Sequence, residues 1–194
     1  MPAYRRIGLC VLAAVAFGVL ARAVALGVPD AAPGVIRFRG HLPLGDSEGE
    51  FRRWEITRAR IDDQHPDCSE VDVSIDLASL DTGNSMRDRH LKGPDFLDVE
   101  HYPTATVKLD TVLVEDADHF SARVQLELHG HTRDLVMHFF IADRAARRVT
   151  SDAVLKRTDF DVGGLGSFLN PLRVDDEVRI IVEVFVPLPA SGAA

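Results

Sequence analysis

Cysteine and clustered positive charge are both scarce in this sequence. Of its two cysteines, Cys10 lies in an N-terminal apolar run and Cys68 in a polar loop, so removal of the N-terminus would leave no pair for an internal disulfide. The formal net charge is −8, and the lysines and arginines are interleaved with acidic residues. Neither nucleic acid nor an anionic membrane surface is therefore an expected electrostatic partner.

Common catalytic motifs are also missing. The sequence has no G-x-S-x-G elbow, no P-loop, no dinucleotide fingerprint and no H-E-x-x-H pair. This favours a binding module over an enzyme, and a hydrolase or isomerase acting on a lipid is the weaker alternative.

The one long apolar run is at the N-terminus. Arg5 and Arg6 precede an uncharged stretch, Ile7 to Leu20, and Ala23-Val24-Ala25 fits a signal-peptidase site. We expect residues 1–25 to be a cleaved signal peptide, residues 26–194 to form the functional domain, and the protein to be exported, either periplasmic or extracellular. An uncleaved membrane anchor is the alternative, but a spanning helix needs roughly 20 apolar residues and Arg22 ends this run early.

Beyond this run, apolar and polar residues alternate with a period of two, which is typical of half-buried strands. The turn-forming His129-Gly130-His131 predicts a hairpin between two of these segments. About eight strands are expected: 35–40, 50–58, 71–77, 105–114, 120–128, 135–141, 149–158 and 178–186. The pattern predicts a single all-β antiparallel domain from about Pro33 to Leu188, although alternation alone leaves a barrel and a sandwich both open.

Several blocks of residues occur in a characteristic order. Ser79 to Pro103 contains S-L-D-T-G-N, then Arg87-Asp88, His90-Leu91, Asp95-Phe96 and Tyr102-Pro103. Gly49-Glu50-Phe51 precedes this stretch, and L-E-L-H-G-H-T-R at 126–133, K-R-T-D-F at 156–160 and D-E-V at 176–178 follow it. In this order the blocks resemble the YceI-like family of polyisoprenoid-binding proteins.

The resemblance implies an antiparallel eight-stranded lipocalin-like barrel, with a short helix and loops after the third strand. In this chain that connection is Ser79 to Pro103. The sequence departs from the family pattern in a short lead before the first strand, and in Asp161 where the family favours glycine. An insertion-like stretch, Gly163 to Leu172, follows Asp161 and affects the expected geometry of the barrel mouth.

An eight-stranded barrel is either filled by its own side chains or encloses one small ligand. The residues expected to point inward carry almost no polar atoms: Val73, Ile75, Leu77, Val107, Leu109, Val124, Leu126, Leu135, Met137, Phe139, Ile180, Val182 and Val184. Such a wall suits a long hydrocarbon, which gains roughly 0.8 kcal/mol per buried methylene, and does not suit a sugar or a nucleotide. The resemblance implies a polyisoprenoid ligand, for example a prenylated quinone, held for transport, storage or sequestration. The alternative is a ligand-free structural or stress-response barrel with a filled core.

Arg87, Asp88 and His90 lie close together, and an acid near an imidazole can transfer protons. However, Asp81 to Asn84 are residue types that form turns and helix caps, so we favour a structural role and assign no catalytic residue. We expect Arg87, Phe96, Tyr102, Arg157 and Asp159 to contribute to a lid or to contact a ligand headgroup.

Histidines raise the question of a metal, since His129 and His131 could share a strand face and His138 lies on the next strand. A zinc site needs three or four converging ligands, so we expect neither a metal nor a cofactor apart from the bound lipid. The expected partner is a small isoprenoid lipid, with only transient membrane contact during lipid exchange. Because members of the family are often dimeric, a homodimer is left open.

Overall fold

A computed structural model describes residues 34–42, 45–62, 65–143, 145–163 and 175–185. The predicted signal peptide and most of the insertion-like stretch, 164–172, lie outside the described residues. Within the described part, no helix is both long and apolar enough to cross a bilayer.

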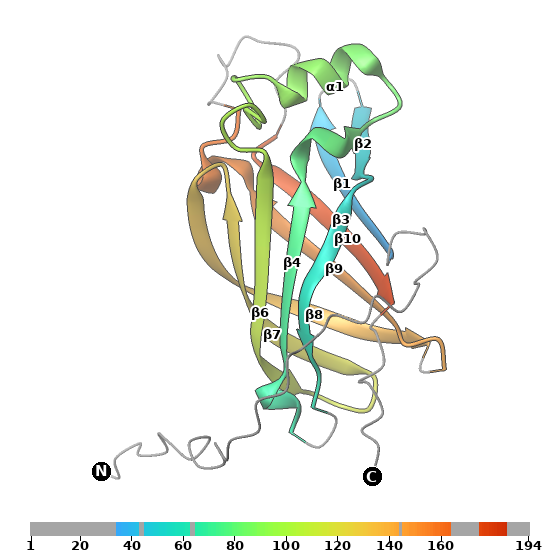
Figure 1. Cartoon of the computed structure of the whole chain (residues 1–194). Coiled ribbons are helices and arrows are strands. Elements are labelled where there is room, and N and C mark those ends of the chain that lie inside the picture. The colour runs from blue at the N-terminus through green and yellow to red at the C-terminus, as the bar shows by residue number, and fades with distance from the viewer. Residues whose placement is uncertain (1–33, 43–44, 63–64, 144, 164–174, 186–194) are drawn as a thin grey trace, which may run out of the picture. The chain divides into compact units, whose positions relative to one another are not determined.

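Ten antiparallel strands form one curled sheet (Figure 1). They are β1 (Gly34–Leu42), β2 (Gly45–Phe51), β3 (Trp54–Arg60), β4 (Glu70–Asp76), β5 (Leu80–Asp81), β6 (Thr104–Val114), β7 (His119–Leu128), β8 (His131–Asp143), β9 (Arg148–Lys156) and β10 (Glu177–Phe185). Their order in the sheet is β3-β4-β6-β7-β8-β9-β10-β1-β2-β5. Three single-turn 3₁₀ helices accompany them: η1 (Pro66–Cys68), η2 (Leu77–Ser79) and η3 (Arg157–Phe160).

The predicted all-β antiparallel fold with one short helix is confirmed, with ten strands in place of eight. The predicted strand 50–58 is divided by a corner at Arg52 and Arg53 into β2 and β3, and β5 is a two-residue strand paired with β2. β2 pairs with β1, while β3 pairs with β4. β3, at one end of the sheet order, therefore directly follows β2, which lies next to the other end, and the sheet curls back toward its own start.

Hydrogen bonds fix this corner. The Arg53 N–H donates to Ser79 Oγ (2.9 Å), and the Arg53 guanidinium donates to Asp76 Oδ2 through Nε (2.9 Å) and Nη2 (2.7 Å). The Asp76 carboxylate also caps η2, because its Oδ1 accepts from the Ala78 N–H. One acidic side chain thus ties the strand corner to the end of β4.

The hairpin predicted at His129-Gly130-His131 joins β7 to β8 through a turn of two residues. His129 and Gly130 both have positive φ, 52° and 74°, which is the backbone of a type I′ hairpin turn. A Cβ on Gly130 would lie 2.9 Å from Cε1 of Tyr102, so the Tyr102 ring covers this turn closely.

Helix α1 (Ser85–Lys92) lies over one end of the curled sheet (Figure 1). Asn84 caps its N-terminus, with Oδ1 accepting the N–H groups of Met86 and Arg87 at 3.1 Å each. The loop after the helix contributes Leu97 to a buried cluster with Leu80, Leu126, Phe160 and Val162. This cluster holds the segment between β5 and β6, which we call the lid (residues 82–103), against the barrel.

Candidate functional site: an apolar cavity inside the barrel

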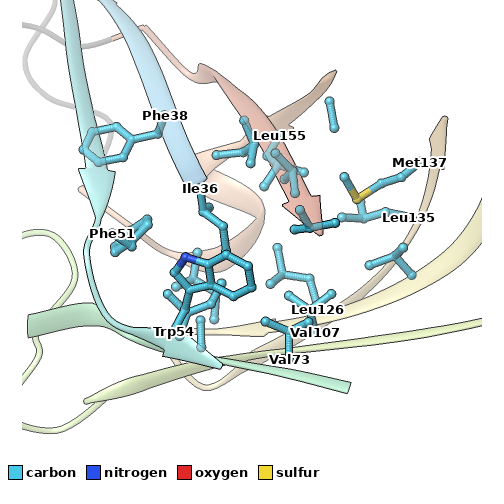
Figure 2. A pocket seen from close by; sticks show the side chains of 18 of the residues that line it. Ile36, Phe38, Phe51, Trp54, Val73, Val107, Leu126, Leu135, Met137 and Leu155 are labelled. Carbon is cyan, nitrogen blue, oxygen red and sulfur yellow. The ribbon is translucent and has the colours of Figure 1, made fainter. Parts of the chain in front are cut away.

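The interior of the barrel is not filled by side chains. It encloses a cavity of about 1320 Å³ that extends from the lid to the opposite end of the sheet. Side chains from strands far apart in the sequence point into it, among them Ile36 of β1, Trp54 of β3, Val107 of β6 and Met137 of β8 (Figure 2). The cavity disfavours the alternative of a filled core.

Every inward residue expected from the alternation lines this cavity. They are Val73, Ile75, Leu77, Val107, Leu109, Val124, Leu126, Leu135, Met137, Phe139, Ile180, Val182 and Val184. The strand alternation did not single out a further group on β1, the β2–β3 corner, β6 and the lid: Ile36, Phe38, Phe51, Trp54, Val112, Met86 and Leu91. The middle of the cavity is consequently bounded by aliphatic and aromatic carbon.

Polar lining residues lie at the two ends of the cavity. Under the lid they include Asn84, Arg87, His90 and Arg157, with no carboxylate among the described lining residues at this end. At the opposite end they include Asp62, Asp116, His119 and Arg147. The lid end is therefore the more cationic of the two.

Arg87 is held in place by the lid itself. Its Nε donates to the Thr82 hydroxyl (2.9 Å) and its Nη2 to the Thr82 carbonyl (2.8 Å). Asp88 contacts the same threonine, and hydrogen bonds from the Thr82 hydroxyl and N–H, together with nearby Lys92 and Arg87, lower the pKa of the Asp88 carboxyl. Both charged residues therefore organise the lid, while Arg87 also lines the cavity.

Arg157 is only 8% exposed and also lines the cavity. Its Nε donates to the Asp175 carbonyl (3.1 Å) and its Nη1 to the Val162 carbonyl (2.9 Å), so backbone groups fix the direction of a buried cation. Asp176 lies next to it. Although burial alone would raise the pKa of Asp176, hydrogen bonds from Thr158 and the charges of Arg157 and Lys156 lower it.

The other predicted lid and headgroup residues take different positions. Phe96 lines the cavity, and the centroid of its ring lies 4.9 Å from the centroid of the His90 ring. Tyr102 and Asp159 are not among the residues that line it. Tyr102 instead packs on His129, with ring centroids 4.4 Å apart, and Asp159 is exposed.

At the end of the cavity away from the lid, Asp116 accepts hydrogen bonds from the N–H groups of Asp118 and His119 and from the His119 ring. These contacts lower the pKa of the Asp116 carboxyl. The carboxylate stays ionised near neutral pH, which makes this end the less suitable one for an anionic headgroup.

The histidines considered for a metal have separate surroundings. His129 Nδ1 lies 3.2 Å from the Phe160 carbonyl oxygen, and His138 Nδ1 lies 3.3 Å from Glu115 Oε1. Among the residues that the structure describes, no group of three or more histidine, cysteine or carboxylate side chains could hold a metal ion.

A curled antiparallel sheet around a large apolar cavity, with a helical lid, defines a lipocalin-like fold. The family model for the YceI-like domain matches residues 30–186. The chain belongs to the YceI-like family.

Comparison with known proteins agrees with this assignment. A UPF0312 protein of Pectobacterium atrosepticum is 28% identical over 76% of this chain and 79% of its own length. A UPF0312 protein of Pseudomonas syringae is 35% identical over 50% of each chain, and one of Vibrio cholerae is 31% identical over 50% of this chain and 51% of its own. The chain thus spans about half the length of several of the curated relatives that it matches.

Solved structures show the same fold. BcnA of Burkholderia cenocepacia superposes with a TM-score of 0.70 at 23% identity, covering 80% of this chain and 97% of its own. A polyisoprenoid-binding domain from Saccharophagus degradans has a TM-score of 0.57 at 18% identity, covering 80% of this chain and 94% of its own.

Proposed function

We propose that this protein is an exported binding protein that holds a polyisoprenoid or a similar long-chain amphiphile inside its barrel. The observation that carries the proposal is the cavity of about 1320 Å³ with polar lining groups at its ends. A hydrocarbon chain needs no directional contact along such a wall, and burial of each methylene contributes roughly 0.8 kcal/mol. The polyisoprenoid-binding domain of S. degradans, which shares the fold, supports this class of ligand.

We propose further that the ligand headgroup lies under the lid. The guanidinium groups of Arg87 and Arg157 line that end, whereas Asp62 and Asp116 line the other. Guanidinium groups favour oxygen acceptors such as a quinone carbonyl or a phosphate. A prenylated quinone or a prenyl phosphate therefore fits better than a prenylated amine.

A binding role needs no chemistry at the site. Asp88 contacts Thr82, and His90 packs on Phe96, so both candidate proton-transfer groups have structural partners. The predicted signal peptide adds a location outside the cytoplasm. The function that fits best is therefore that of an exported carrier, store or sequestering protein.

The test is native mass spectrometry of the exported protein purified without detergent, followed by solvent extraction. A mass excess that extracts as a prenyl lipid is the expected result. Trp54, the single tryptophan of the chain, lines the cavity, so its emission should also be quenched when a geranylgeranyl-substituted naphthoquinone is added. The proposal would be refuted if the purified protein carried no lipid and its Trp54 emission did not change on addition of prenyl quinones or prenyl phosphates.

A further inference from the structure

The wall of the barrel is interrupted between β8 and β9. β8 pairs with β7 from His131 to Phe140, and β9 pairs with β10 along its whole length. In contrast, the ladder between β8 and β9 ends at the pair Phe139–Ser151, where Ser151 Oγ donates to the His138 carbonyl (2.8 Å). Beyond this pair, no ladder contact joins the two strands within the described residues.

A second, smaller hollow of about 220 Å³ marks the interruption. It is lined by residues 135–138 of β8 and 152–155 of β9. These are the residues that would face each other if the register of the last pair continued, with Val136 opposite Val154. We call this opening the β8–β9 slit.

The slit adjoins the main cavity. Leu135, Met137, Ala153 and Leu155 line both hollows, and Figure 2 shows Leu135, Met137 and Leu155 around the main one. The interior side of the slit is therefore the same apolar wall that would hold the ligand.

The outer rim of the slit is part apolar and part polar: Val136 and Val154 lie at its middle, and His138 and Asp152 lie at one end. Val136 is 68% exposed and Val154 is 56% exposed, although outward positions on neighbouring strands carry ion pairs such as Arg123–Asp110 (2.9 Å). The two exposed valines face each other across the slit, and their neighbours along each strand line the cavity, so apolar side chains lie on both sides of the wall at this point.

We propose that the β8–β9 slit is a side portal through which the hydrocarbon chain of the ligand enters and leaves the cavity. The proposal rests on the proposed function. With its headgroup under the lid, a ligand that threaded from the opposite end would have to move a polar group along a wall that offers it no partner. Lateral passage avoids this, because the chain slips between the strands while the headgroup stays near the lid end.

The experiment closes the slit covalently. Val136→Cys and Val154→Cys are introduced in a chain that also carries Cys10→Ser and Cys68→Ser, and the two thiols are oxidised or bridged with a short bismaleimide. The matched control is Gln125→Cys with Asp134→Cys, which face each other in the intact β7–β8 ladder. Loading is followed by quenching of Trp54 after mixing with phosphatidylcholine vesicles that contain a geranylgeranyl-substituted naphthoquinone.

Bridging the slit should slow loading by about tenfold or more without changing the occupancy at equilibrium, while the bridged control should load at the rate of the parent. Loading of the bridged slit variant at the parent rate would overturn the portal and leave the binding function intact. If the unmodified protein itself fails to take up the quinone, the binding function fails and the portal with it. Ala153→Phe, which narrows the slit without a cross-link, gives a second test and should also slow loading.

Discussion

Oδ1 of Asp88 accepts two hydrogen bonds from Thr82, one from the backbone N–H at 2.9 Å and one from the hydroxyl at 2.5 Å. The adjacent Arg87 donates to the hydroxyl and the carbonyl of the same threonine. Two neighbouring residues of α1, one of each charge, thus hold the loop that enters the helix. This local network places the lid over the cavity.

Asp88→Ala should loosen the lid. Loss of the two hydrogen bonds should lower the free energy of unfolding by about 1 kcal/mol at neutral pH. The pKa of Asp88 is lowered in the folded state, so its stabilisation is present above the unfolded value of about 3.9 and is lost as the pH falls through the lower folded value. Denaturation curves at pH 7 and pH 3 should show the difference between parent and variant shrinking in acid. The exposed Asp95→Ala serves as the control and should change little at either pH.

Gly130→Ala should destabilise the β7–β8 hairpin. A non-glycine residue at φ 74° costs of order 1 kcal/mol, and the added Cβ would also approach the Tyr102 ring to 2.9 Å. Gly83→Ala is a close control, because Gly83 has φ 71° but a Cβ added there would meet no atom within 4 Å. Thermal unfolding should therefore show a larger loss for Gly130→Ala, and equal losses would mean that Tyr102 moves aside freely.

Two phenylalanines should respond differently to truncation. Phe160 is 1% exposed in the cluster under the lid, and Phe160→Ala should cost about 3–5 kcal/mol. Phe139 stacks on Phe120 with ring centroids 5.0 Å apart, but another part of its surface faces the cavity. Phe139→Ala should therefore cost clearly less in chemical denaturation of the ligand-free protein. A cost as large as that of Phe160→Ala would indicate that the interior is packed in solution.

Val182→Asp and Met137→Asp should abolish lipid binding, because an ionised carboxylate in the apolar wall has no partner there. Ile181→Asp is the matched control for the first variant: Ile181 is adjacent on β10 and is not among the cavity-lining residues. Bound prenyl lipid, measured by extraction from the folded variants, should fall only for the two inward substitutions. If the folded Val182→Asp variant bound a normal amount of prenyl lipid, β10 would not be part of the binding site.

The sequence predicted the inward faces of the strands well wherever a strand is regular. Along β4, β7 and β10 the period of two alone decides which side chains point inward, and all the predicted residues line the cavity. The prediction failed where a corner or a bulge interrupts the alternation of inward and outward side chains. Phe51 and Trp54 both face the cavity although they are three residues apart, because the Arg52–Arg53 corner lies between them.

A similar shift occurs in β6. Leu109 and Val112 both line the cavity across a β-bulge in which Thr111 has a positive φ of 52°. The β8–β9 slit could not be predicted for a different reason. The exposure of residues 135–138 and 152–155 alternates as it does in a regular strand, so the period of two does not mark an opening there. The slit is visible only in the pairing of the strands, because β8 keeps its ladder with β7 and β9 keeps its ladder with β10 where the β8–β9 ladder has ended. A pattern within one strand does not contain this information.

The pairing of β1 with β10 has a consequence for the order of folding. Ile36 pairs with Val182, so the first described strand needs the last one before this part of the wall can form. Contacts between such distant segments form late, because the intervening chain must first be brought together. A chain emerging from a ribosome or a translocation pore would be unable to complete its barrel until nearly all of it had passed through. The topology itself would then make closure of the barrel a late step of folding.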